Sequence, residues 1–194
     1  MSLLRKGTIT RRGGKPAPIL LDSYSETYID AGFSIYAVFP PTPEQSHFGA
    51  VGQAITMSIN KKLSSIKFWL KKYGNLDCQL VVRAYAATGT VGTNARPTGD
   101  ALAESNVVEA ATLSSSGGLV EFIFTGANKI TLNNGQSYCF LVLCKSATLI
   151  DGSNYFEVWV DASSPTHAGN NCVYYDGAWA GSDVYDSCFY LYGV

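Results

Sequence analysis

The feature that most constrains this chain is a pair of alternating runs within Leu63–Ala86, separated by a turn-rich break at Tyr73–Asp77. Ile66, Phe68 and Leu70 share one side of the first run, and the second run alternates in the same way. Alternation with period two, rich in β-branched and aromatic residues, is typical of half-buried antiparallel strands. The glycine and asparagine of the break suit the positive φ of a hairpin connection. The sequence therefore predicts a long central β-hairpin with one face toward solvent.

Similar strand-like runs continue along the rest of the chain. Turn residues such as Asn133–Gly135 and Asp176–Gly177 separate them. The run Tyr138–Lys145 is apolar on both faces, which indicates a central strand. About ten strands without a convincing helical period predict an all-β fold, namely a jelly-roll-like antiparallel two-sheet β-sandwich. A closed barrel is the alternative.

The composition fits one globular core made in a reducing compartment. Of the 194 residues, 46% are hydrophobic and 15% are charged. No apolar run approaches the roughly 20 residues of a membrane-spanning helix, so no membrane partner is expected. The N-terminus lacks the apolar stretch of a secretory signal, which predicts synthesis in the cytoplasm. The five cysteines are odd in number and lack C-x-x-C spacing, which predicts free, buried thiols.

The N-terminal segment differs from the rest of the chain in charge. The first 15 residues carry five basic and no acidic side chains, whereas the remaining 179 carry nine basic and fifteen acidic ones, so the net charges are +5 and −6. Residues 1–21 are therefore expected to form an extended basic arm, and residues 22–194 the sandwich domain. The candidate partner-binding residues are the basic side chains of this arm: Arg5, Lys6, Arg11, Arg12 and Lys15.

The charge of the arm favours an acidic protein partner over nucleic acid. A basic segment can bind phosphates, but this arm is short and has no interleaved aromatic residues. The acidic domain behind it would also repel a polyanion. An arm that becomes ordered on an acidic protein surface is the better interpretation, and no nucleic-acid partner is expected.

No constellation of residues predicts catalysis. A hydrolytic site would need His47 or His167 beside a nucleophile and an orienting acid such as Asp161. A histidine that hydrogen-bonds within its own turn is the simpler interpretation. Asp151, Glu157 and Asp161 could act as paired carboxylates, and Glu157 and Asp161 share a strand face, but solvated acids on a wet face are the usual explanation. We therefore expect no enzymatic activity, no metal ion and no cofactor.

Two tryptophans are candidates for an exposed aromatic surface. Trp69 lies between Lys67 and Lys71 on the polar side of its run, and Trp179 follows a tight turn. Exposed aromatic side chains bind sugars or form protein interfaces. A purely structural role is the simpler interpretation of such residues.

The second half of the chain resembles the choice-of-anchor type R domain. The resemblance is carried by the segments AYAATGTVGTNARPTGDALAES, LVEFIFTGANKITLNNGQSYCFLV, NYFEVWVDASSPTHAGN and YYDGAWAGSDVYDSCFYLYG. That β-sandwich module occurs in bacterial surface proteins and in phage or prophage proteins. The resemblance spans residues 49–193 and implies a display or adhesion-like context, with no catalytic residues to transfer.

Two functional hypotheses follow from this resemblance. Unlike the bacterial surface members, the chain is expected to have neither a signal peptide nor a C-terminal anchor, and a cytoplasmically made virion protein is therefore expected. The first hypothesis is a capsid decoration protein, or another head- or tail-attached accessory of a tailed bacteriophage, bound to other virion proteins as a homo-oligomer or lattice. The alternative is a carbohydrate- or receptor-binding module that contacts a host-surface glycan.

Overall fold

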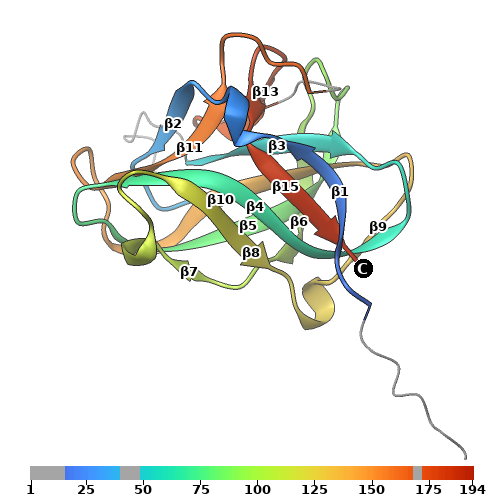
Figure 1. Cartoon of the computed structure of the whole chain (residues 1–194), viewed down its shortest axis with the longest axis horizontal. Coiled ribbons are helices and arrows are strands. Elements are labelled where there is room, and N and C mark those ends of the chain that lie inside the picture. Colours follow the sequence, from blue (N-terminus) through green and yellow to red (C-terminus); the bar gives the residue numbers. More distant parts are fainter. Residues whose placement is uncertain (1–15, 40–48, 168–171) are drawn as a thin grey trace, which may run out of the picture.

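The structure is a computed structural model that describes residues 16–39, 49–167 and 172–194. In these ranges, fifteen strands form two antiparallel sheets packed face to face, and three short 3-10 helices lie in the connections (Figure 1). This arrangement confirms the predicted all-β two-sheet sandwich. The strands outnumber the ten expected, in part because β7, β9 and β14 are paired segments of only two residues each.

The eight-stranded sheet is organised around the 13-residue strand β4. Phe68 of β4 pairs with residues of both β15 and β8, which places those strands on opposite sides of β4. The strands of this sheet are β1 (Ile19–Tyr24), β2 (Ala31–Ile35), β4 (Lys61–Tyr73), β8 (Gly118–Ile123), β9 (Thr131–Leu132), β11 (Tyr155–Asp161), β14 (Asp186–Ser187) and β15 (Phe189–Gly193).

The seven-stranded sheet has the order β13-β12-β3-β10-β5-β6, and β7 also pairs with β5. Its strands are β3 (Ala50–Thr56), β5 (Asp77–Thr88), β6 (Arg96–Glu104), β7 (Val108–Glu109), β10 (Ser137–Leu149), β12 (Cys172–Tyr175) and β13 (Trp179–Ser182). The predicted central strand is confirmed, since β10 lies between β3 and β5. The predicted hairpin around Asp176–Gly177 is also confirmed, with Gly177 at a φ of 72°.

The predicted central hairpin is wrong. Both runs are strands, but β4 and β5 lie in different sheets, and residues 74–76 cross from one sheet to the other. Phe68 and Leu80 therefore enter the same core from opposite sides. Alternation shows which side chains of a strand are buried, but a hairpin and a crossing give the same alternation. Gly74, with a φ of 64°, allows the turn in either case.

The structure has a second apolar cluster outside the main core. The core between the sheets contains large, fully buried side chains such as Phe68, Phe122 and Phe140. On the outer face of the seven-stranded sheet, Val81 and Leu141 belong to a further buried cluster. The face of β5 that contains Val81 was expected to be wet, and much of it is instead covered.

The five cysteines are free and buried, in agreement with the prediction. Burial raises the pKa of the Cys139 thiol to about 12. This thiol is therefore protonated at neutral pH, which makes it a poor nucleophile.

Candidate binding surfaces

The predicted partner-binding arm is described only at its C-terminal end. Its five basic residues, Arg5, Lys6, Arg11, Arg12 and Lys15, lie outside the described residues. Strand β1 begins at Ile19, so the last three residues of the expected arm belong to the eight-stranded sheet. The residues just before β1 are exposed, and they line a groove of about 360 Å³. The lining residues are Pro16, Ala17, Pro18, Ser64, Ser65, Glu121, Ile123, Lys129 and Val194.

Exposed apolar side chains lie near this groove. Leu20 of β1 is 51% exposed and pairs with Tyr192 of β15, which in turn pairs with Ser65 of β4. Ser65 also pairs with Ile123 of β8, which is 44% exposed, so Leu20 and Ile123 lie in one row of paired residues across four strands. Ile19 is exposed as well. The end of the eight-stranded sheet from which the arm leaves thus presents apolar side chains to solvent.

A ladder of three side-chain pairs covers the outer face of β4 and β11. The pairs are Tyr73 with Tyr155, Lys71 with Glu157, and Trp69 with Trp159. The two tyrosine rings stack with centroids 4.5 Å apart and planes 12° apart, and the two indole centroids are 5.0 Å apart. Each such cross-strand pair contributes roughly 0.2–1 kcal/mol to sheet stability.

Trp69 is half-buried in this ladder, not an exposed platform. A Cβ atom placed on Gly117 would lie 1.7 Å from the Cη2 atom of Trp69, so the loop before β8 covers the edge of the indole. The Lys71 ammonium lies 5.6 Å from the ring centroid of Trp159 and 4.7 Å from that of Tyr73. Because the rings contact one another and Lys71, the ladder offers little free aromatic face to a sugar.

The two acids weighed as paired carboxylates are hydrogen-bonded within the protein. Glu157 Oε2 accepts hydrogen bonds from the Tyr73 hydroxyl and the Trp159 indole, each at 2.9 Å. Asp161 is only 2% exposed, and its Oδ2 accepts a hydrogen bond of 2.6 Å from the Tyr24 hydroxyl. Burial raises the pKa of Asp161, but the hydrogen bonds to its carboxylate outweigh this and lower the pKa overall. The expectation of solvated acids is therefore wrong for Asp161.

Trp179 is also half-buried. Its ring centroid lies 4.9 Å from that of Tyr175, 5.5 Å from Phe39 and 5.7 Å from Tyr85. These contacts place Trp179 over the second apolar cluster of the seven-stranded sheet. Its main role here is to shield that cluster from solvent.

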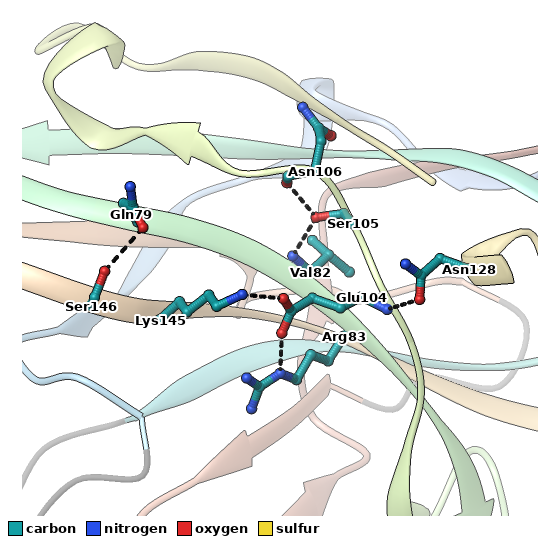
Figure 2. A network of polar contacts seen from close by, with 9 residues as sticks. All are labelled: Gln79, Val82, Arg83, Glu104, Ser105, Asn106, Asn128, Lys145 and Ser146. Carbon is teal, nitrogen blue, oxygen red and sulfur yellow. Dashed lines mark hydrogen bonds and ion pairs between the residues drawn. The ribbon is translucent and has the colours of Figure 1, made fainter. Parts of the chain in front are cut away.

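A polar network ties β6 to β5 and β10 on the same sheet (Figure 2). The Glu104 carboxylate accepts a 2.8 Å bond from Arg83 Nε and a 2.5 Å bond from Lys145 Nζ. Its backbone N–H donates to the Asn128 side chain. Next to it, the Ser105 hydroxyl accepts from the backbone N–H of Val82. Burial raises the pKa of Glu104, and the two cations outweigh this effect and lower the pKa.

This network fixes one end of a wide bulge in β6. Ala103 pairs with Ala84, but the next pair is Thr98 with Ala86, so residues 99–102 are looped out. A cleft of about 590 Å³ lies between this bulge and the turn that connects β9 to β10. It is lined by Ala86, Ala87, Gly89, Leu102, Asn133, Asn134, Gly135, Gln136, Ser137 and Tyr138. Nothing in the sequence pointed to this cleft.

Within the part of the chain that the structure describes, His167 belongs to a buried polar cluster, and its side chain bonds to Asp22 instead of its own turn. Its side chain is 8% exposed, and Nε2 lies 3.0 Å from Asp22 Oδ1. Its backbone N–H donates to Asp186 Oδ2 at 3.0 Å, and its ring packs against the edges of Tyr24 and Phe189. Among the described residues, Nδ1 has no hydrogen-bond partner. The histidine therefore links its loop to β1 and β14.

The environment of His167 predicts a pH-dependent stability. Burial lowers its pKa, but the hydrogen bond to Asp22 and the charges of Asp22 and Asp186 outweigh burial, so the pKa is raised above 6.5. A histidine with a raised folded pKa stabilises the fold fully below its unfolded pKa. That contribution is lost as pH rises through the folded pKa. We therefore expect the melting temperature to decrease over this range.

Thermal unfolding at a series of pH values tests this expectation. The decrease above pH 6.5 should be smaller in His167→Gln and in Asp22→Asn, because each removes one partner of the interaction. Asp183→Asn changes an exposed acid and should keep the wild-type profile. If the melting temperatures of the His167 and Asp22 variants fell with pH as steeply as that of the wild type, the His167–Asp22 interaction would not be the cause of the decrease.

Comparisons with known proteins add no relative. No family model matches the chain, and no curated protein or solved structure is significantly similar to it. Within the described ranges, no group of three or more His, Cys, Asp or Glu residues is placed to hold a metal ion. None of the described segments forms a helix long and apolar enough to cross a membrane. The resemblance to the choice-of-anchor type R domain stays a prediction from the sequence.

Proposed function

We propose that this chain is a non-enzymatic structural protein of a bacteriophage particle, attached through its basic N-terminal arm to other virion proteins. In this proposal the protein is made in the host cytoplasm and is a decoration protein or another head- or tail-attached accessory. The resemblance to the choice-of-anchor type R domain supplies the particle context. The attachment itself is inferred from the charge and surface of the chain.

The observation that carries the proposal is that a charged segment of the sequence joins the sandwich next to exposed apolar side chains. The segment before Pro16 holds a net charge of +5, while the rest of the chain holds −6. Where this segment joins the sandwich, Ile19, Leu20 and Ile123 are exposed apolar side chains beside a groove. Exposed apolar groups gathered near a charged segment are typical of a protein interface. They suit a partner with an acidic surface and an apolar contact.

Particle-binding assays with arm variants test this function. Particles that lack the protein are mixed with purified full-length chain, with a variant lacking residues 1–15, and with Arg11→Glu or Arg12→Glu. We expect the deletion to abolish binding and to leave the melting temperature nearly unchanged, because β1 begins only at Ile19. The charge reversals should weaken binding, and added salt should weaken the wild type, since exposed ion pairs are screened.

Arg96→Glu is the matched control, because Arg96 is an exposed arginine on β6, in the other sheet. It should bind particles as the wild type does. Wild-type binding by the deletion variant would show that the arm is not the anchor. A deletion variant that fails to fold would show that the arm is an integral part of the sandwich. Both outcomes contradict the proposal.

A second candidate function is carbohydrate binding. The aromatic ladder does not favour it, because its rings contact one another. The cleft between the β6 bulge and the β9–β10 turn does favour it, because its lining residues are uncharged.

A further inference from the structure

The cleft beside β6 is lined by small side chains of β5 and by an exposed leucine. Ala86 and Ala87 of β5 form part of its lining. Leu102, in the looped-out part of β6, is 45% exposed although it is a large apolar side chain. The volume of about 590 Å³ lies within the range of roughly 300–1,000 Å³ that is usual for small-molecule sites.

The opposite wall of the cleft presents side-chain amides from a rigid turn. The backbone of this turn is fixed to the β3–β4 connection, since Met57 N–H donates to Gln136 O and Gly135 N–H donates to Met57 O. Asn134 N–H donates to the Asn60 side chain, and Asn133 N–H donates to the Tyr138 hydroxyl. These bonds use backbone groups of the turn. Among the described residues, the exposed side-chain amides of Asn133, Asn134 and Gln136 have no hydrogen-bond partner.

The charge of the cleft restricts the class of ligand. None of its lining residues carries a formal charge at neutral pH. A charged ligand would lose water there without gaining a counter-charge, which is unfavourable. A carbohydrate without charged groups suits the site, because its hydroxyls can exchange hydrogen bonds with amides, which both donate and accept. The C–H face of a sugar ring can contact Leu102.

We propose that the cleft between Leu102 and residues 133–137 binds an uncharged carbohydrate. The site lies on the seven-stranded sheet, whereas the arm leaves from the eight-stranded sheet, so the two functions are separate. Asn134 and Gln136 provide hydrogen bonds to hydroxyl groups, and Leu102 provides apolar contact. The inference does not depend on attachment to a particle.

Nuclear magnetic resonance titration of the full-length protein tests the site directly. Isotope-labelled protein is titrated with neutral oligosaccharides built from glucose, galactose, mannose and N-acetylglucosamine, and with a sialylated one for comparison. We expect at least one neutral sugar to shift the backbone amide signals of residues 133–137 and of Leu102. Asn134→Ala and Leu102→Glu should each weaken its binding about tenfold, which is 1.4 kcal/mol.

Leu119→Glu is the matched control for Leu102→Glu, because Leu119 is also an exposed leucine but lies on β8 of the other sheet. It should bind as the wild type does. Both substitutions are at exposed positions, so a folded variant is expected, and its amide spectrum verifies this. Three results would overturn the proposal. They are no shift with any neutral sugar, shifts only with the sialylated sugar, and shifts at the cleft with an extended peptide instead, which would indicate strand addition at the β6 edge.

Discussion

Replacing Gly52 by alanine should destabilise the protein by about 3 kcal/mol or more, the upper part of the range for overpacked sites. Gly52 lies in β3, paired with Leu141 of β10 on one side and Val173 of β12 on the other. A Cβ atom there would lie 1.9 Å from the carbonyl oxygen of Phe140 and 2.9 Å from the Cα atom of Leu141. Both are backbone atoms of a central strand, so relief of the clash requires β10 itself to move.

The Gly52 carbonyl also accepts a 2.8 Å hydrogen bond from the buried Ser187 hydroxyl, which joins the two sheets. Movement of β3 would disturb that contact as well.

Chemical denaturation of purified variants measures the loss of stability caused by Gly52→Ala. Gly118→Ala is the matched control, because Gly118 is also in a strand and a Cβ atom there would meet nothing within 4 Å. It should change stability by no more than about 0.5 kcal/mol. Equal effects at the two sites would contradict the close approach of β3 and β10.

Truncating Phe68 to alanine should cost roughly 3–5 kcal/mol, and truncating its neighbour Trp69 should cost less. Phe68 is fully buried between the sheets. Trp69 has the larger side chain, but it lies half-buried on the outer face, where it contacts Trp159 at 5.0 Å between centroids. Its loss removes this contact and the packing beneath Gly117, without opening a cavity in the core.

Denaturant titration of the two variants checks this order. Because they are adjacent in one strand, any effect on strand propensity is similar for both, and the difference reports on the two faces. A larger loss for Trp69→Ala would mean that the faces of β4 are reversed, as in a register shifted by one residue. Trp159→Ala is a useful companion, since it should resemble Trp69→Ala.

The local pattern of the chain was sufficient to predict which side chains of many strands point into the core. Ile66, Phe68 and Leu70 are fully buried, as their alternation indicated. The turn at Asn133–Gly135 and the central position of β10 were also predictable. These features depend on short-range geometry, because the side chains of a strand alternate with period two and tight turns require particular residues.

The pairing of strands was decided by the tertiary structure. Successive strands joined by a short turn can pair with each other or cross between sheets, and the local pattern is the same for both. At residues 74–76 the chain crosses, so β4 pairs with β15, β8 and β11 instead of β5. Only contacts between residues far apart in the chain favour one arrangement over the other.

The tertiary structure also determined which of the candidate binding surfaces are exposed. The +5 charge of the first 15 residues is evident from the sequence alone, and so is the presence of tryptophans on polar strand faces. Whether a tryptophan is free or covered depends on distant partners such as Gly117 for Trp69 and Phe39 for Trp179. The cleft beside Leu102 arises because a four-residue bulge in β6 lies opposite a turn some 30 residues later in the chain, and no local pattern encodes that distance.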